Sequence, residues 1–175
     1  MLKSLITALA VFAAFSTVQA QNEAASPTDA QIAMIAVVAD TVDIDAGNMA
    51  ARKTKNKMVR EFAKTMVRDH TAVNAQATAL AKKLGVIPEE SDTSKSLKSD
   101  GDKTMTRLMT LTGAAFDKAY IDNEVSYHEA VLDVLDKTLI PNTRNAELKS
   151  LIESARPIFV THLEHAKKVQ ASLTR

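Results

Sequence analysis

The chain has 175 residues, with 46% hydrophobic and 25% charged side chains, four Gly, four Pro and no Cys or Trp. This composition is that of a globular domain, and so little Gly and Pro argues against a sandwich or barrel of many short strands. The absence of Cys excludes disulfides, thiolate metal sites and cysteine nucleophiles, and the formal net charge of +1 gives no indication of nucleic-acid binding, so four His and the carboxylates must carry any chemistry.

Residues 1–20 have the pattern of a cleaved secretory signal. Lys3 is the only charge, an apolar stretch follows over residues 5–15, and the segment ends on the small residue Ala20. The apolar stretch is shorter than the about 20 residues that a membrane-spanning helix needs. We therefore expect cleavage after Ala20, export to the periplasm (or secretion) and no membrane span afterwards. A tail over residues 21–27 and a single domain over residues 28–175 would remain, with 21 basic and 21 acidic side chains.

Two long helices are predicted in the first half of the domain. Residues 26–29 (SPTD) suit a helix start, with Ser26 as N-cap, Pro at the first helical position and an acid at the third. Small and apolar residues then recur every three or four positions, which predicts a helix to about Arg52. A second stripe of this kind predicts a helix over residues 56–84, with Gly85 ending it.

A longer connection and two more helices follow. Residues 85–100 are expected to form a crossover, with room for a short helix at 102–111. The third helix is predicted over 112–139 and is ended by Pro141 and Asn142, and the fourth runs over 145–172. Pro157 falls inside the fourth helix, where it predicts either a kink or a helix that begins near residue 156.

Two helical hairpins joined by a long crossover predict an all-α fold, a four-helix bundle with the ferritin-like arrangement. Periodicity alone would also permit a simple up-and-down bundle. Residues 56–62 (NKMVREF) resemble residues 145–151 (NAELKSL), and each segment opens the second helix of its hairpin. This internal similarity favours the paired hairpins.

All four His fall on the apolar stripes of the predicted helices. His70 interrupts the stripe of the second helix, His128 that of the third, and His162 and His165 that of the fourth. Glu124 lies one turn before His128 on the same face. Asp43 is at an inward position of the first helix, while Asp69 and Glu129 adjoin His residues.

Inward imidazoles and carboxylates together are typical of a metal site, because a buried ionised carboxylate needs a partner. Such ligands suit Zn, Cu or Fe. A di-iron centre is not expected, since the Glu-x-x-His pairs that it needs are absent. The predicted ligands are His70, His128, His162, Glu124, His165 and Asp43.

Two other interpretations of the His residues stay open. They can form a hydrogen-bonded polar layer with Asp43, Asp69 and Glu124 that fixes the register of the helices without a metal. Alternatively, His165 can lie at the bundle surface with no part in a site.

Three segments resemble a widespread bacterial family of exported ferritin-like proteins, whose members are labelled as domains of unknown function or as outer membrane proteins. They are residues 61–71 (EFAKTMVRDHT), residues 113–120 (GAAFDKAY) continuing to His128 and Glu129, and residues 157–163 (PIFVTHL). The resemblance implies a ferritin-like fold, an envelope location and one His at each of positions 70, 128 and 162. It implies no reaction, and His165 and Glu124 depart from the usual family residues.

These observations lead to three hypotheses of function. The first is an exported metal-binding protein for metal buffering or stress protection, with no catalytic residue and no nucleic-acid partner. The second is a non-enzymatic helical envelope protein whose His layer only fixes packing; a homodimer is compatible with either. The third is a His/Glu hydrolase or oxidase, which would need an open coordination position and a substrate pocket.

Overall fold

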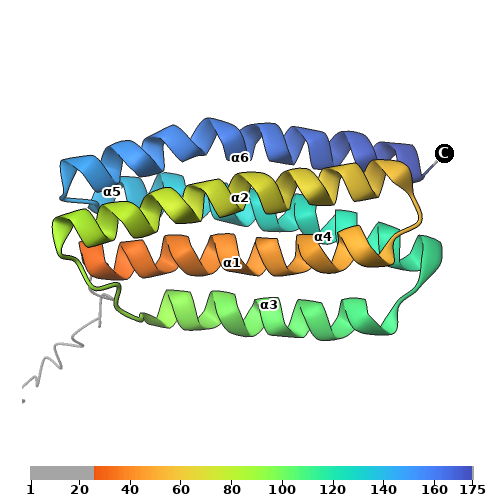
Figure 1. Ribbon diagram of the computed structural model, residues 1–175, viewed down its shortest axis with the longest axis horizontal. Helices are drawn as coiled ribbons and strands as arrows, with labels where there is room; N and C mark the ends of the chain where they lie inside the picture. Colours follow the sequence, from red (N-terminus) through yellow and green to blue (C-terminus); the bar gives the residue numbers. More distant parts are fainter. Residues whose placement is uncertain (1–25, 175) are drawn as a thin grey trace, which may run out of the picture.

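The computed structural model describes residues 26–174, and within that range it is an all-helical bundle with no strand. The predicted signal peptide and most of the predicted tail lie outside the described residues. Figure 1 shows the long helices running side by side, with α3 alongside α1 at the edge of the bundle. The elements are α1 (Asp29–Lys53), α2 (Lys57–Leu84), α3 (Asp92–Thr110), α4 (Gly113–Val134), η1 (Leu135–Leu139), α5 (Ile140–Asn142) and α6 (Ala146–Leu173).

The helix starts follow from short polar side chains that cap free backbone N–H groups. The expectation that Ser26 caps the first helix is wrong, because Thr28 does so: its hydroxyl accepts from Gln31 N and its own N–H donates to the Gln31 side chain. Asn56 and Asn145, the first residues of the similar segments, cap α2 and α6, and each side chain accepts from the N–H groups two and three residues later. The two similar segments are therefore equivalent helix starts.

The crossover between the hairpins contains more helix than the sequence indicated. Gly85 ends α2 in the left-handed conformation (φ 64°), as predicted, but α3 begins at Asp92 and extends over 19 residues. This helix packs on α1 and, less extensively, on α4. Gly101 allows the close approach, since a Cβ there would lie 2.8 Å from both γ-methyl groups of Val42.

The two prolines that were expected to disturb helices have different effects. The helical segment ends at Asn142, as predicted, but Pro141 lies inside its last turn: α4 continues through the π-helical turn η1 into α5, and Ile140 N–H donates to Leu135 O, five residues back. π-Helix in proteins occurs mostly as such single turns inside α-helices. Pro157 lies within α6, which is one helix from Ala146 to Leu173, so a helix that begins near residue 156 is excluded.

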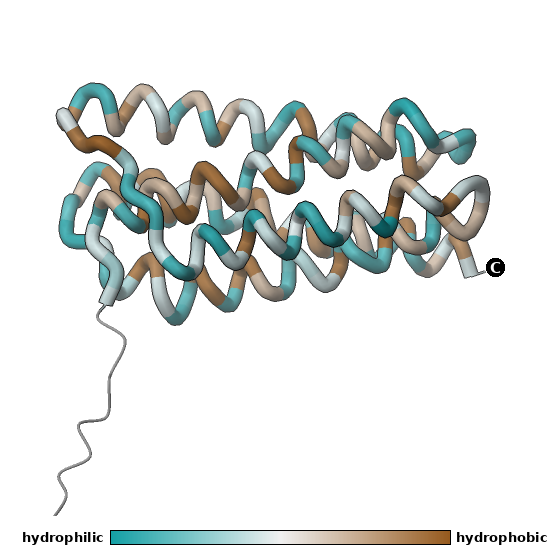
Figure 2. Tube along the Cα trace, turned by 90° about the horizontal axis from the view of Figure 1, so that it is seen from below, coloured by the Kyte–Doolittle hydropathy of each residue, from teal (hydrophilic) through white to brown (hydrophobic). Residues whose placement is uncertain are grey.

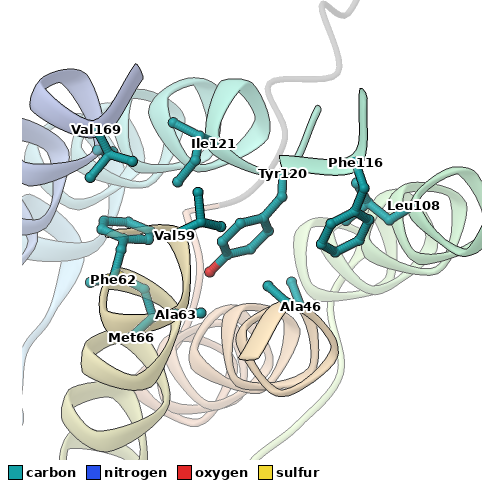
Figure 3. Close-up of a cluster of buried hydrophobic side chains, with 12 residues drawn as sticks. Ala46, Val59, Phe62, Ala63, Met66, Leu108, Phe116, Tyr120, Ile121 and Val169 are labelled. Atoms are coloured by element: carbon teal, nitrogen blue, oxygen red, sulfur yellow. The ribbon is translucent and has the colours of Figure 1, made fainter. Parts of the chain in front are cut away.

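Two apolar clusters fill the bundle. The Tyr120 cluster, shown in Figure 3, comprises Ala46, Ala50, Val59, Phe62, Ala63, Met66, Leu108, Phe116, Tyr120, Ile121, Ala166 and Val169. The Ile152 cluster comprises Ile32, Ile35, Val73, Leu135, Leu139, Leu148, Ile152, Ala155 and Phe159. Along α1, α2, α6 and the continuous segment of α4 and η1, the two clusters are separated, which leaves a segment between them for other side chains.

The helices alternate apolar and polar residues along their length, as the tube in Figure 2 shows. This alternation is typical of helices with one buried face. Within residues 26–174, no helix combines the length and the apolar character needed to cross a bilayer.

Candidate metal centre

The segment between the two apolar clusters holds a layer of buried polar side chains. Every member is at most 3% exposed, and all four main helices contribute at least one. We call this set the polar layer; it comprises Asp40 and Asp43 of α1, His70 of α2, Glu124 and His128 of α4, and His162 of α6. Burying so many ionisable groups is costly unless they are paired or bind an ion, so their contacts decide what the layer does.

His70 lies between the two aspartates of α1. Its Nδ1 is 2.7 Å from Asp40 Oδ1 in a hydrogen bond, and its Nε2 is 2.6 Å from Asp43 Oδ2. The second contact is short but not aligned as a hydrogen bond, so Nε2 has no such partner. Phe159 stacks on the imidazole, with ring centroids 5.0 Å apart and planes 7° apart, which holds the ring in place.

His128 is oriented by the backbone of its own helix. Its Nδ1 lies 2.9 Å from the carbonyl oxygen of Glu124, and because a carbonyl only accepts, Nδ1 must carry the proton. The other nitrogen, Nε2, is 3.6 Å from Asp43 Oδ2 and has no hydrogen-bond partner. Burial lowers the pKa of His128, so its Nε2 carries a free lone pair near neutral pH.

His162 is held by a carboxylate at the edge of the layer. Its Nε2 lies 3.0 Å from Asp69 Oδ2, and Arg68 contacts both oxygens of that carboxylate and lowers its pKa. An ionised Asp69 only accepts, so Nε2 donates and Nδ1 is left unprotonated and without a partner. Burial lowers the pKa of His162 to about 4, although Asp69 opposes this.

The three imidazoles thus share one arrangement. Each is oriented through one ring nitrogen by an oxygen (of Asp40, of the Glu124 backbone or of Asp69) and leaves the other ring nitrogen buried without a hydrogen bond. Their potential ligand atoms lie within 4.8 Å of one another. Orientation by an oxygen on the far nitrogen is characteristic of His residues that bind metal ions.

Two carboxylates of the layer lack hydrogen-bond partners on both oxygens. They are Asp43 and Glu124, and together with His128 they form a second group whose potential ligand atoms lie within 4.8 Å. Burial raises the pKa of Glu124 well above its usual value, and the neighbouring Asp43 adds to this. Burial would also raise the pKa of Asp43, but the attraction of His70 prevails and lowers it to about 2.

His70 is the positive group of the layer in the absence of an ion. Burial by itself would lower its pKa, but the combined effect of Asp43 and Asp40 raises it to about 10. The ion-free layer is therefore organised around a His70 imidazolium between two aspartates.

Five of the six predicted ligands meet in the polar layer: Asp43, His70, Glu124, His128 and His162. His165, the sixth, is outside it and belongs to neither of the two groups. Its half-buried ring packs edge-on against Phe62, with centroids 5.1 Å apart. Of the acids that adjoin His residues, Asp69 orients His162, whereas Glu129 forms an exposed ion pair with Lys167.

Sequence reasoning missed Asp40. It lies three residues before Asp43, so both side chains are on the same face of α1. That spacing was visible in the sequence, but only the fold shows that His70 lies between the two carboxylates.

Residues 14–169 match a family described as a domain of unknown function, DUF4142. The chain belongs to this family. The match agrees with the resemblance to a family of unknown function, while the ferritin-like and exported character stay predictions. No curated protein matches the sequence. Among solved structures, CopM in the Cu(II)-bound form is similar with a TM-score of 0.66 and 15% identity, over 84% of this chain and 98% of CopM, which supports an all-α bundle.

Proposed function

We propose that the polar layer binds one transition-metal ion through His70, His128, His162 and Asp43, with Glu124 beside it. The observation that carries the proposal is the set of three buried, oriented imidazoles, each with one ring nitrogen that has no hydrogen-bond partner and with potential ligand atoms within 4.8 Å of one another. An ion that binds His70 would displace the proton from its Nε2. Three imidazoles and a carboxylate suit Cu(II), Zn(II) or Fe(II). Unpartnered buried nitrogens and carboxylates are otherwise unfavourable, so an ion would satisfy several of them at once.

Cu(II) is the first ion to test. CopM shares the bundle fold and its structure is of a Cu(II)-bound form, although 15% identity carries the likeness of fold and no ligand correspondence. We further propose that the protein works in the periplasm as a metal-buffering or stress-protection protein of ferritin-like architecture. The signal-like residues 1–20 support this location.

The competing function is a structural layer that never binds metal. Its support is the contact of His70 with both Asp40 and Asp43, which offsets charge without an ion. Asp43, Glu124, His128 and His162 would still have unpartnered buried atoms in that case, which favours the metal site.

The two functions are separated by a matched pair of substitutions on α6. His162→Gln removes a proposed ligand, and His165→Gln makes the same change three residues away, outside the layer. We expect Cu(II) affinity to fall at least about 100-fold in the first variant, beyond the range of about 10–100-fold that is usual for groups that only orient a ligand. The second variant should bind as the wild type does.

The measurements are elemental analysis of untagged protein and calorimetric titration with Cu(II), Zn(II) and Fe(II). Less than about 0.1 equivalent of every metal after purification, together with no binding in the titrations, would exclude the metal site and leave the structural layer.

A further inference from the structure

We propose that the groove between α1, α3 and α4 is the passage through which a divalent cation reaches the polar layer. The groove has a volume of about 270 Å³, and Asp43 and Glu124 are among the residues that line it. This inference rests on the proposed function, since a passage for a cation has meaning only if the layer binds one.

The inner end of the groove is built from carboxylates whose oxygens have no hydrogen-bond partner. Glu124 and the neighbouring Asp43 are each 1% exposed, and both carboxylate oxygens of each residue lack a hydrogen-bond partner. A buried carboxylate of this kind is costly unless a cation, a proton or water satisfies it. Because Asp43 also contacts His70 and lies near His128, an ion that reaches Glu124 is adjacent to the proposed ligands.

Most of the accessible lining of the groove is apolar, but α3 and α4 contribute polar side chains to its walls. Thr104 of α3 and Asn123 of α4 approach each other across it, with their side-chain oxygens 3.5 Å apart. Asp100 lies farther out and is exposed, although Lys103 pairs with it at 2.8 Å. A hydrated cation can exchange water for such oxygens step by step.

A second cavity offers no such route. It has a volume of about 100 Å³ and lies within the Ile152 cluster, where its accessible lining is apolar even though Asp40 borders it. An apolar cavity excludes a hydrated ion, so the groove beneath α3 is the route with the right chemistry.

Helix α3 forms one wall of this passage and covers it from outside. It packs on α1 and α4, and Figure 1 shows it beside α1 at the edge of the bundle. A larger side chain on α3 can therefore narrow the groove without altering a proposed ligand.

The test compares two identical substitutions on α3. Thr104→Phe fills the groove, whereas Thr106→Phe places the same ring on an exposed position of the helix outside this groove. Stopped-flow mixing of the full apo-protein with Cu(II), followed by the fluorescence of Tyr120 and Tyr127, gives the association rate, and transfer to a chelator gives the dissociation rate. These are the only two tyrosines of the chain.

A passage affects the rates of binding and release alike. We expect Thr104→Phe to slow both about tenfold or more and to leave the equilibrium affinity within about twofold, because gating changes a barrier and not the bound state. Thr106→Phe should match the wild type. Unchanged rates in a folded Thr104→Phe protein that binds Cu(II) normally would overturn the passage alone, whereas wild-type protein that binds no ion would overturn the proposed function and the passage with it.

A second pair of variants covers the case in which Thr104→Phe does not fold. Asp100→Lys reverses a charge at the mouth, and Asp102→Lys does so at another exposed position of α3, where Asp102 pairs with Lys98. Association should be slowed about threefold at low salt by Asp100→Lys only, and the difference should fade as ionic strength rises. Equal rates in the two variants would contradict the passage.

Discussion

The Tyr120 cluster and the polar layer are neighbours at the same depth of one bundle, yet they are buried for different reasons. In the cluster, the aromatic rings of Phe62, Phe116 and Tyr120 pack against one another, with centroids 6.1 and 6.4 Å apart. Apart from the Tyr120 hydroxyl and the Met66 thioether, the cluster offers no side chain that could bind an ion. In the layer, most groups are charged or polar and many lack a partner. The Tyr120 cluster therefore stabilises the fold, whereas the polar layer consists of side chains that the fold brings together.

The largest expected effect is a loss of stability on substitution in the Tyr120 cluster. Phe62→Ala should lower the free energy of unfolding by about 3–5 kcal/mol, because Phe62 is fully buried and its removal leaves a cavity. Cu(II) affinity of the folded variant should stay within about twofold of wild type, since Phe62 is outside the layer. Urea unfolding and calorimetric titration check the two quantities.

Met58→Ala is the control, because Met58 is 48% exposed and its truncation should change stability by no more than about 0.5 kcal/mol. A large loss of metal affinity in Phe62→Ala would show that cluster and layer are not separable.

The next effect concerns the stability of ion-free protein in alkaline solution. The pKa of His70 is raised to about 10 in the folded state, so its stabilising contribution is complete below its unfolded pKa of about 6.5 and is lost as pH rises through 10. The raised pKa of Glu124 acts in the same direction. We expect the apo-protein to lose on the order of 3 kcal/mol between pH 7 and 10.

Chemical unfolding in chelator at several pH values measures this loss, and His70→Gln should weaken the dependence. A flat profile in the wild type would mean that His70 is neutral in the folded layer.

The smallest effect concerns a residue that orients a ligand. Asp40→Asn keeps the size of the side chain but removes the charge that contacts His70 Nδ1, so Cu(II) affinity should fall about 10–100-fold. Asp45→Asn, on an exposed position of the same helix, is the matched control and should have no effect. Equal affinities in both variants would show that Asp40 does not support a metal ligand.

The sequence predicted the four main helices because each carries a long stripe of apolar and small residues at helical spacing, and three of them begin at a side chain that caps the helix. It did not predict the length of α3, whose residues are largely exposed and polar and which depends on tertiary contact with α1. Nor did it predict that helical structure continues through Pro141: the Asn142 side chain donates to the Thr138 carbonyl and the Thr143 hydroxyl to the Leu139 carbonyl, which satisfies oxygens near the break.

The sequence predicted which residue types form the site, but only some of the individual residues. His70, His128 and His162 were found because each interrupts an apolar stripe. His165 was included on the same ground, but it lies about 60° beyond His162 on the helical wheel by the spacing of a 3.6-residue turn, and the fold turns it toward Phe62. Periodicity specifies a face of a helix, whereas membership of a site depends on the rotation of that helix against its neighbours.

The division of the polar layer between the two hairpins has a consequence for assembly. The α1–α2 hairpin carries Asp43 and His70, and the α4–α6 hairpin carries His128 and His162. Neither hairpin alone contains the proposed ligand set, so an ion at the layer would stabilise only the docked pair, by about 2.7 kcal/mol at a concentration 100 times its dissociation constant. In a chain without cysteine, such an ion would act as a reversible cross-link between two hairpins that residues 85–112 separate in sequence.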